Sequence, residues 1–400
     1  MHCTRKVTED IYWVGADDRR LHLFENIFPI PNGVSYNSYL IMDEKVTLMD
    51  TADFSVTRQF MENIDYVLQG KEIDYLVINH MEPDHCANIE NLAKRFPKMQ
   101  LVGNKKTAQM MSQFFDMDFS DRMLLVNELD ELCIGKHTLQ FVFAPMVHWP
   151  EAMVTYEKTE KILFSADAFG TFGTLNGNIF MDEIDYDSRW LADARRYYTN
   201  IVGKYGVQVQ NLLKKASGLD IAMICALHGP IIRKDPGFLI DKYIKWSTYE
   251  PEDKSVMIVY GSMYGNTESA VNALASRLGD AGVSKIAVYD VSTTHVSELI
   301  AEIFRCSHLV LACPTYNGGI YPPMENFITD MKALNVQNRK VALLDNGTWA
   351  PAAGKQMVEM LGSMKNMEIL GDTLSVKSAL KADKEEQMAA FVQLITDSYL

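Results

Sequence analysis

The segment NHMEPDHC constrains this chain more than any other stretch of its sequence. It places His80, Glu82, Asp84 and His85 directly after an apolar strand expected at Tyr75–Asn79. Ionisable side chains rarely crowd at the end of a buried strand, because desolvation and repulsion between carboxylates oppose it. A bound dication reverses both effects. The sequence therefore predicts a metal site at the end of this strand.

Three further candidate ligands also follow apolar runs. His148 lies in FAPMVHWPE, Asp167 in ILFSADAFG and His228 in ICALHGP. A single histidine after a strand is more often a surface or capping residue, but these three together with the loop at His80 form a set. If they converge, four imidazoles and three carboxylates are available, which is enough for two metal ions. Asp167 is the natural bridging ligand.

Composition narrows the class of protein. A chain of 400 residues suggests two or three domains of roughly 100–200 residues each. The net charge of −14, without a lysine or arginine cluster, argues against nucleic acid or an anionic membrane as partner. None of the six cysteines forms a C-x-x-C pair, so no rubredoxin-like module is expected. With no apolar leader and no apolar run of about 18 residues, the chain is predicted to be cytoplasmic.

The first 250 residues mix short strands with a few helices, and the polar stretch TYEPEDKS ends this pattern. We therefore expect a metal-binding domain at 1–250 and a second domain at 251–400. The first should be a layered sheet sandwich with helices outside. Besides Tyr75–Asn79, its strands are expected at Ser38–Met42, Val46–Asp50, Gln100–Gly103, Leu139–Phe143, Met153–Tyr156, Ile162–Ser165 and Ile221–Cys225. Its helices are expected at Val56–Leu68, Thr107–Phe115 and Ser188–Ala216.

The second domain alternates regularly between strand and helix. Strands are expected at Val256–Tyr260, Lys285–Tyr289, His308–Cys313 and Val341–Asp345, with one more short strand before the last helix. Helices are expected at Asn266–Leu278, Val296–Arg305, Pro323–Leu334, Ala352–Leu361 and Lys384–Tyr399. This rhythm predicts a doubly wound parallel sheet of flavodoxin type, with its binding site at the carboxyl ends of the strands.

Three loops at those carboxyl ends form a candidate flavin site. The first, SMYGNT, runs into a helix whose backbone N–H groups favour a phosphate, and it lacks both G-K-[ST] and G-x-G-x-x-G. A hydroxyl-rich loop without lysine suits the phosphate of FMN. Tyr316 and Trp349 are the candidate aromatic walls for the flavin ring. The predicted FMN residues are Ser262, Met263, Tyr264, Gly265, Asn266, Thr267, Pro314, Thr315, Tyr316, Asn317, Gly318, Asn346, Gly347, Thr348 and Trp349.

The metal loop resembles that of the metallo-β-lactamase superfamily, in which the usual pattern is H-x-H-x-D-H. Glu82 stands where that pattern has its second histidine, and a carboxylate shifts preference from zinc towards iron or manganese. The H-x-E-x-D-H variant and the SMYGNT loop resemble the flavodi-iron proteins, or A-type flavoproteins. This resemblance implies a metallo-β-lactamase-like αββα sandwich followed by a flavodoxin-like sheet.

The same resemblance implies a ligand set for two iron ions. It assigns His80, Glu82 and His148 to one iron, Asp84 and His228 to the other, and Asp167 to both. His85 is included as a further ligand, although in some relatives the equivalent ring turns away from the metal. Two segments depart from the family pattern. HLFENIFP, with Phe24 or Glu25, replaces a D-F-H-G-like segment, and the loop at Trp349 differs from the common G-S-Y-G-W.

The implied enzyme is an oxidoreductase in which FMN passes electrons to a non-haem di-iron centre. It would reduce dioxygen to water as oxygen detoxification, or nitric oxide to nitrous oxide, and no motif separates the two gases. The resemblance also implies a head-to-tail homodimer, or a dimer of dimers. The external electron donor would be a rubredoxin or a reduced flavin or deazaflavin. A zinc hydrolase fused to a flavodoxin-like regulator and an electron carrier with a vestigial metal fold are the remaining alternatives.

Overall fold

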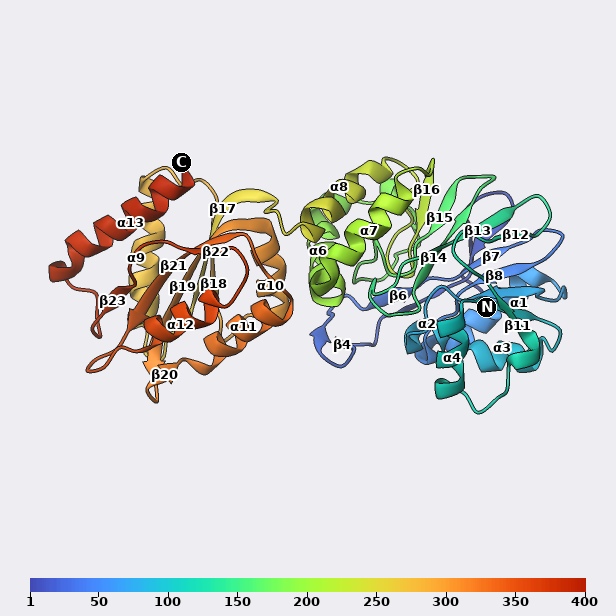
Figure 1. Ribbon diagram of the computed structural model, residues 1–400, viewed down its shortest axis with the longest axis horizontal. Coiled ribbons are helices and arrows are strands. Elements are labelled where there is room, and N and C mark those ends of the chain that lie inside the picture. Colours follow the sequence, from blue (N-terminus) through green and yellow to red (C-terminus); the bar gives the residue numbers. More distant parts are fainter. The chain divides into compact units, whose positions relative to one another are not determined.

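The computed structural model describes residues 1–400. The chain forms two compact units, one comprising residues 1–198 and 205–244 and the other residues 199–204 and 245–400 (Figure 1). Each unit has its own hydrophobic core. The domain boundary expected between residues 250 and 251 stays a prediction.

The first unit contains two sheets packed face to face. The larger sheet has the strand order β1-β2-β7-β8-β9-β10-β11 and the smaller the order β12-β13-β14-β15-β16. The larger consists of Arg5–Lys6, Ile11–Trp13, Tyr39–Ile41, Thr47–Met49, Tyr75–Val77, Gln100–Gly103 and Met123–Leu125. The smaller consists of Glu131–Cys133, Thr138–Phe143, Met153–Glu157, Ile162–Phe164 and Met223–Cys225. Two ribbons complete the unit, β3 (Ala16–Asp18) with β6 (Val34–Tyr36) and β4 (Leu23–Phe24) with β5 (Phe28–Pro29).

Helices cover the outer faces of both sheets. The larger sheet carries α1 (Thr57–Leu68), α3 (Ile89–Arg95) and α4 (Lys105–Phe114), and the smaller carries α7 (Gly206–Ala216) and α8 (Pro236–Ser247) (Figure 1). Between the sheets, Trp13 and Met49 of one pack with Phe141 and Phe164 of the other. Strands that are buried on both faces need apolar residues throughout, which explains runs such as YLI and TLM. The αββα sandwich is therefore confirmed.

The second unit is a parallel sheet with the order β18-β17-β19-β21-β22. This is the 2-1-3-4-5 order of flavodoxin-like folds, so the predicted fold class is confirmed. Its strands are β17 (Asp253–Tyr260), β18 (Ile286–Asp290), β19 (Cys306–Tyr316), β20 (Gly319–Ile320), β21 (Arg339–Asn346), β22 (Met367–Ile369) and β23 (Leu374–Val376). Its helices are α9 (Asn266–Asp280), α10 (Val296–Arg305), α11 (Pro322–Ala333), α12 (Ala353–Gly362) and α13 (Glu385–Tyr399). Helices α9 and α13 share one face, and α10, α11 and α12 cover the other (Figure 1).

The structure corrects one predicted helix and adds others. Instead of a single helix over 188–216, the chain forms α5 (Tyr186–Arg189), α6 (Leu191–Tyr197), a π-helical turn and a 3₁₀ turn before α7. Gly203 and Gly206 are poor helix formers and interrupt the pattern. Helix α8 was missed because its opening Pro-Gly pair is typical of a turn, whereas proline is also favoured at the first helical position. None of the helices combines the length and the apolar character that a membrane span requires.

Candidate metal centre and flavin site

The predicted metal loop follows β9 and contains the short helix α2 (Pro83–Cys86). Proline at the first helical position fixes the direction in which α2 begins. The backbone carbonyl of His85 accepts hydrogen bonds from the N–H and the hydroxyl of Thr51, at 2.9 and 2.7 Å. At the start of the loop, the carboxylate of Asp50 accepts from the backbone N–H and the side-chain amide of Asn79, at 2.7 and 2.8 Å. These buried contacts fix both ends of the loop and so position its side chains.

The other candidate ligands come from the smaller sheet. His148 lies in the loop between β13 and β14, Asp167 follows β15, and His228 follows β16. Because β15 and β16 are parallel neighbours, their carboxyl ends lie side by side. The two sheets thus direct their candidate ligands to one edge of the sandwich.

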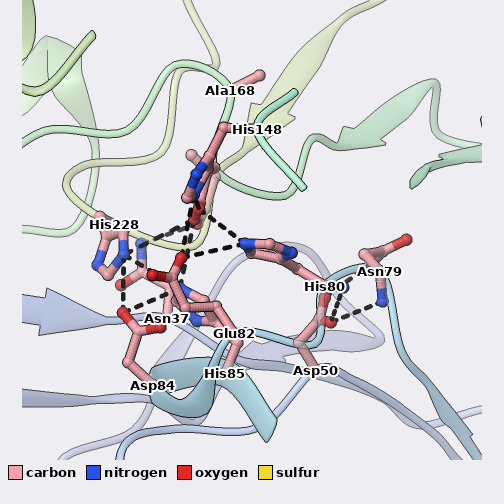
Figure 2. A network of polar contacts seen from close by, with 12 residues as sticks. Asn37, Asp50, Asn79, His80, Glu82, Asp84, His85, His148, Ala168 and His228 are labelled. Carbon is pink, nitrogen blue, oxygen red and sulfur yellow. Dashed lines mark hydrogen bonds and ion pairs between the residues drawn. The ribbon is translucent and has the colours of Figure 1, made fainter. Parts of the chain in front are cut away.

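His80, Glu82, His148 and Asp167 form a first cluster, in which one ligand atom from each residue lies within 4.8 Å of the others. Glu82 Oε2 is 3.2 Å from His80 Nε2 and 3.0 Å from His148 Nε2. Asp167 Oδ2 is 3.2 and 3.1 Å from the same two nitrogens. Figure 2 shows the imidazoles of His80 and His148 directed at the Glu82 carboxylate from two sides. Two imidazoles and two carboxylates therefore face one point.

Asp84, His85 and His228 form a second cluster. Asp84 Oδ2 is 3.2 Å from His85 Nε2 and 3.3 Å from His228 Nε2, and these nitrogens are 3.1 Å apart. The second oxygen of Asp167, Oδ1, lies 3.3 Å from His85 Nε2. Asp167 thus turns one oxygen to each cluster, which is the geometry of a bridging carboxylate. The structure brings all seven predicted metal residues into these two clusters, His85 among them.

Unsatisfied polar atoms test whether these clusters suit metal ions. Both carboxylate oxygens of Asp84 and Oδ1 of Asp167 are buried and accept no hydrogen bond, although Asp84 Oδ2 and Asp167 Oδ1 lie at ion-pair distance from His85 Nε2. A buried carboxylate without hydrogen bonds is strongly unfavourable, and coordination of a cation removes that penalty. The two clusters, joined by Asp167, therefore fit a pair of metal ions.

The electrostatics of the two clusters also favour bound cations. Burial opposes protonation of His148, but the carboxylates of Asp167 and Glu82 outweigh burial and raise the pKa of His148 to about 9. In the same way, Asp84 and Asp167 outweigh burial and raise the pKa of His85 to about 10. Burial alone would raise the pKa of Asp167, yet the neighbouring His80 and His85 hold it well below its ordinary value. The carboxylates therefore draw positive charge, as protons or as metal ions, into a buried site.

A second layer of contacts orients the imidazoles. Glu151, which is buried, accepts from His80 Nδ1 at 2.9 Å and from the N–H of Met81 at 2.8 Å. His228 Nδ1 donates to the carbonyl of Ser35 at 2.8 Å. With Nδ1 engaged in each ring, Nε2 is left for a metal ion, which is how outer contacts commonly fix a histidine ligand.

A pocket of about 470 Å³ lies at the carboxyl ends of β17, β19 and β21 in the second unit. The three predicted loops converge on it, and every predicted FMN residue except Gly265 lines it, together with Ala350 and Ser378. Gly265 instead precedes α9 with a φ of 85°, a left-handed conformation that favours glycine. A volume of this size is typical of a cofactor site.

Some of these side chains support the loops. The side chain of Asn346 accepts from the N–H of Ser378 at 2.9 Å and donates to its carbonyl at 2.8 Å. Thr315 Oγ1 accepts from the N–H of Ala352 at 2.8 Å. By contrast, the side chains of Trp349 and Tyr264 are 91% and 90% exposed and are open to a ligand. The pocket thus fits FMN, with hydroxyls and the start of α9 for its phosphate and aromatic side chains for its ring.

Comparisons with known proteins agree with this geometry. A family described as "ODP family beta lactamase" matches residues 34–229, and the flavodoxin family matches residues 258–391. An uncharacterized protein of Methanocaldococcus jannaschii is 30% identical over 98% of both chains. The anaerobic nitric oxide reductase flavorubredoxin of Aeromonas hydrophila is 30% identical over 87% of this chain and 70% of its own length.

Solved structures match over nearly the full chain. Rubredoxin oxygen:oxidoreductase from Desulfovibrio gigas has a TM-score of 0.92 and 28% identity, covering 99% of this chain and 98% of its own. The flavodiiron protein from Giardia intestinalis has a TM-score of 0.92 and 26% identity, covering 99% and 97%. The chain belongs to the flavodi-iron protein family. It is therefore an oxidoreductase.

The cofactors of this flavodi-iron protein are FMN and a non-haem iron pair. The carboxylate-containing first cluster agrees with iron, because hard oxygen ligands disfavour zinc relative to iron. The alternatives of a zinc hydrolase and of an electron carrier with a vestigial metal fold find no support.

The segment HLFENIFP lies beside both clusters. The ring of Phe24 packs edge-on against His228, with 5.5 Å between ring centroids. Much of Glu25 is exposed to solvent, but its carboxyl lies close enough to Glu82 for the two groups to interact. Partial burial, together with the negative charge of Glu82, raises the pKa of Glu25 to about 8. An acidic side chain therefore lies next to the Glu82 carboxylate at this point of the chain.

Sequence reasoning missed Glu151, Ser35, Tyr197 and Ser378. Glu151 left a weak signal, since it is a carboxylate that follows His148 closely in HWPE. Tyr197 packs 5.4 Å from the His228 ring, measured between centroids, but it lay inside the long helix that was predicted wrongly.

Proposed function

We propose that this flavodi-iron protein reduces dioxygen to two waters, as a defence against oxygen. The observation that carries the proposal is the pair of buried clusters joined by Asp167, with buried carboxylate oxygens that accept no hydrogen bond. The name of the Desulfovibrio gigas relative, a rubredoxin oxygen:oxidoreductase that matches this chain almost end to end, supports dioxygen as the substrate.

We propose that each cluster holds one iron ion and that Asp167 is shared between them. His80, Glu82 and His148 would hold one iron, Asp84, His85 and His228 the other, and Asp167 would hold both. Once held by these residues, reduced FMN and a ferrous pair would together supply the four electrons that dioxygen needs, and the iron ions would supply a binding site that polarises the gas. Four protons complete the balance, O₂ + 4e⁻ + 4H⁺ → 2H₂O.

Contacts from surrounding residues would keep two histidine side chains ready to coordinate iron. Glu151 holds the proton on His80 Nδ1, and the carbonyl of Ser35 holds the proton on His228 Nδ1, so both Nε2 atoms stay free to coordinate. Phe24 and Tyr36 pack against His228, with centroid distances of 5.5 and 5.7 Å, and shield that side from water. In the other unit, the pocket between Tyr264, Tyr316 and Trp349 would hold the flavin ring.

Nitric oxide is the second candidate substrate. It is supported by the name of the Aeromonas hydrophila relative, an anaerobic nitric oxide reductase flavorubredoxin. That reaction is 2NO + 2e⁻ + 2H⁺ → N₂O + H₂O and needs only half the electrons. Steady-state rates on both gases, measured with the same chemically reduced donor, decide between them. A dioxygen rate well above the nitric oxide rate supports the proposal, and the reverse order replaces it with nitric oxide reduction.

We also propose a head-to-tail homodimer, in which the FMN of one subunit serves the irons of the other, and an external donor such as a rubredoxin or a reduced flavin or deazaflavin. Mixing His228→Ala subunits with subunits altered in the FMN loop tests the dimer. Hybrids that regain partial activity support it, and inactivity of every folded hybrid contradicts it. A cytoplasmic location belongs to the same proposal and is supported by six free cysteines.

A further inference from the structure

An apolar cavity of about 170 Å³ lies in the first unit between the smaller sheet and helices α7 and α8. Strands β14, β15 and β16 contribute Val154, Leu163 and Ile224, and α7 contributes Val209 and Leu212. None of the proposed metal or FMN residues lines it.

The cavity reaches the backbone that carries two proposed ligands. Its inner wall includes Val147 and Ala168, which directly precede His148 and follow Asp167 in the chain, and both are buried. Figure 2 shows Ala168 beyond His148, on the side away from Glu82 and Asp84. The outer rim includes the half-buried Leu213. The cavity therefore lies between the half-buried Leu213 and the backbone next to His148 and Asp167.

The few polar groups along the cavity are already engaged. The hydroxyl of Ser165 donates to the carbonyl of Ala168 at 2.7 Å, and that of Ser217 donates to the carbonyl of Lys214 at 2.8 Å. The hydroxyl of Tyr243 accepts from a backbone N–H at 2.6 Å. A water molecule needs two to four polar partners, and an engineered apolar cavity of about 150 Å³ stays dry and binds xenon. This cavity thus suits a small apolar molecule better than water.

We propose that the cavity is a reservoir through which the gaseous substrate reaches the metal centre. A diatomic gas has too little polarity to need hydrogen bonds, and it gains dispersion contacts with the apolar wall. The volume is far below what FMN or an organic electron donor requires. The inference rests on the proposed function, because it takes a small gas as the substrate.

Xenon tests the cavity without any catalytic activity. Crystals of the holoenzyme under xenon pressure should show xenon between α7 and the smaller sheet. Val209→Phe fills the inner part of the cavity and should remove that site. Val207→Phe makes the same change on the same helix at a side chain that is 68% exposed, and it should leave xenon in place. Xenon bound only elsewhere in the wild-type protein overturns the proposal.

Kinetics test the role in gas delivery. Val209→Phe should lower kcat/KM for the gas by roughly tenfold and leave kcat at saturating gas unchanged. A tenfold loss corresponds to an increase of about 1.4 kcal/mol in the barrier to entry of the gas. Ala216→Phe obstructs the half-buried outer part and provides a second variant if Val209→Phe unfolds. Val207→Phe should match the wild-type protein.

The outcomes separate the two proposals. If the wild-type protein consumes neither dioxygen nor nitric oxide, the proposed function is refuted without any variant. If the enzyme is active and a folded variant excludes xenon yet keeps the wild-type kcat/KM, the reservoir is refuted while the proposed function stands.

Discussion

The side chains around the metal centre are almost entirely buried, whereas the aromatic side chains around the flavin pocket face solvent. His80 and Asp167 are 0% and 1% exposed, while Trp349 is 91% exposed. Strand ends and helix α2 position the metal ligands, and contacts such as Glu151 to His80 lock them in place. The flavin pocket is formed by three loops that are held at their bases by Asn346 and Thr315.

This difference indicates how strongly each cofactor is coupled to the fold. A cluster of buried carboxylates and imidazoles has few ways to relax, so a change in charge there acts on both metal binding and stability. Loops with exposed aromatic side chains can move, and their ligand completes the pocket. Alterations at the metal centre should therefore have large effects, and alterations at the pocket should have small ones.

The largest effect is expected from Asp167→Asn. This change removes the charge of the bridging carboxylate, so both metal ions should be lost and gas reduction should fall by roughly a thousandfold, about 4 kcal/mol in the barrier. Iron content, FMN content and turnover are the measurements. The exposed Asp187→Asn is the control and should keep all three. Retention of both irons in Asp167→Asn would contradict the bridging role.

Stability of the iron-free protein should depend on pH through its imidazoles. Burial opposes the charge on His148, but Asp167 and Glu82 raise its pKa from 6.5 to about 9. Because the pKa of His148 is higher in the folded than in the unfolded chain, its protonation stabilises the folded protein. This contribution is fully present below about pH 6.5 and is lost as pH rises through about 9. At 1.36 kcal/mol per unit, the loss is about 3 kcal/mol from this group.

Thermal unfolding of iron-free protein across pH 6–10 measures this loss. The iron-loaded protein is the matched control, because coordination keeps the imidazoles unprotonated and the same decline should be absent. Equal pH profiles for the two forms would show that the imidazoles do not interact with these carboxylates as described.

A smaller effect is expected from Glu151→Gln, which removes the charge that supports His80. Iron affinity should fall by roughly 10–100-fold. The control is Glu157→Gln, a change at another buried glutamate, which lies 3.1 Å from His137 and outside the metal centre. If both variants bind iron equally, Glu151 has no role in orienting His80.

The smallest effect is expected from Trp349→Ala. Loss of one stacking partner should weaken FMN binding by roughly fivefold, about 1 kcal/mol, because the remaining contacts can rearrange. Iron content should not change. Fluorescence titration with FMN measures the affinity, and Phe54→Ala, at an exposed ring in the other unit, is the control. A loss of a hundredfold would show that the pocket is as rigid as the metal centre.

The same contrast explains what the sequence could and could not predict. The ligands at His80 to His85 were predictable because they are adjacent in sequence and follow a strand. Glu151 was not, because its partner His80 lies 71 residues away and a single carboxylate in a loop has no distinctive pattern. The parallel sheet of the second unit was predictable from its regular alternation.

Features that depend on tertiary packing escaped the sequence. The break in the helix predicted over 188–216 and the presence of α8 determine where α7 packs. The apolar cavity lies beneath those two helices, so no local pattern could indicate it. The raised pKa of His148 likewise needs the positions of Glu82 and Asp167.

Metal and flavin analysis of protein purified without oxygen shows whether each chain holds an iron pair and one FMN. We expect two iron ions and one FMN per chain, and in the Asp167→Asn variant we expect FMN without iron. Zinc in place of iron, or a single metal ion per chain, would contradict a paired iron centre built on Asp167.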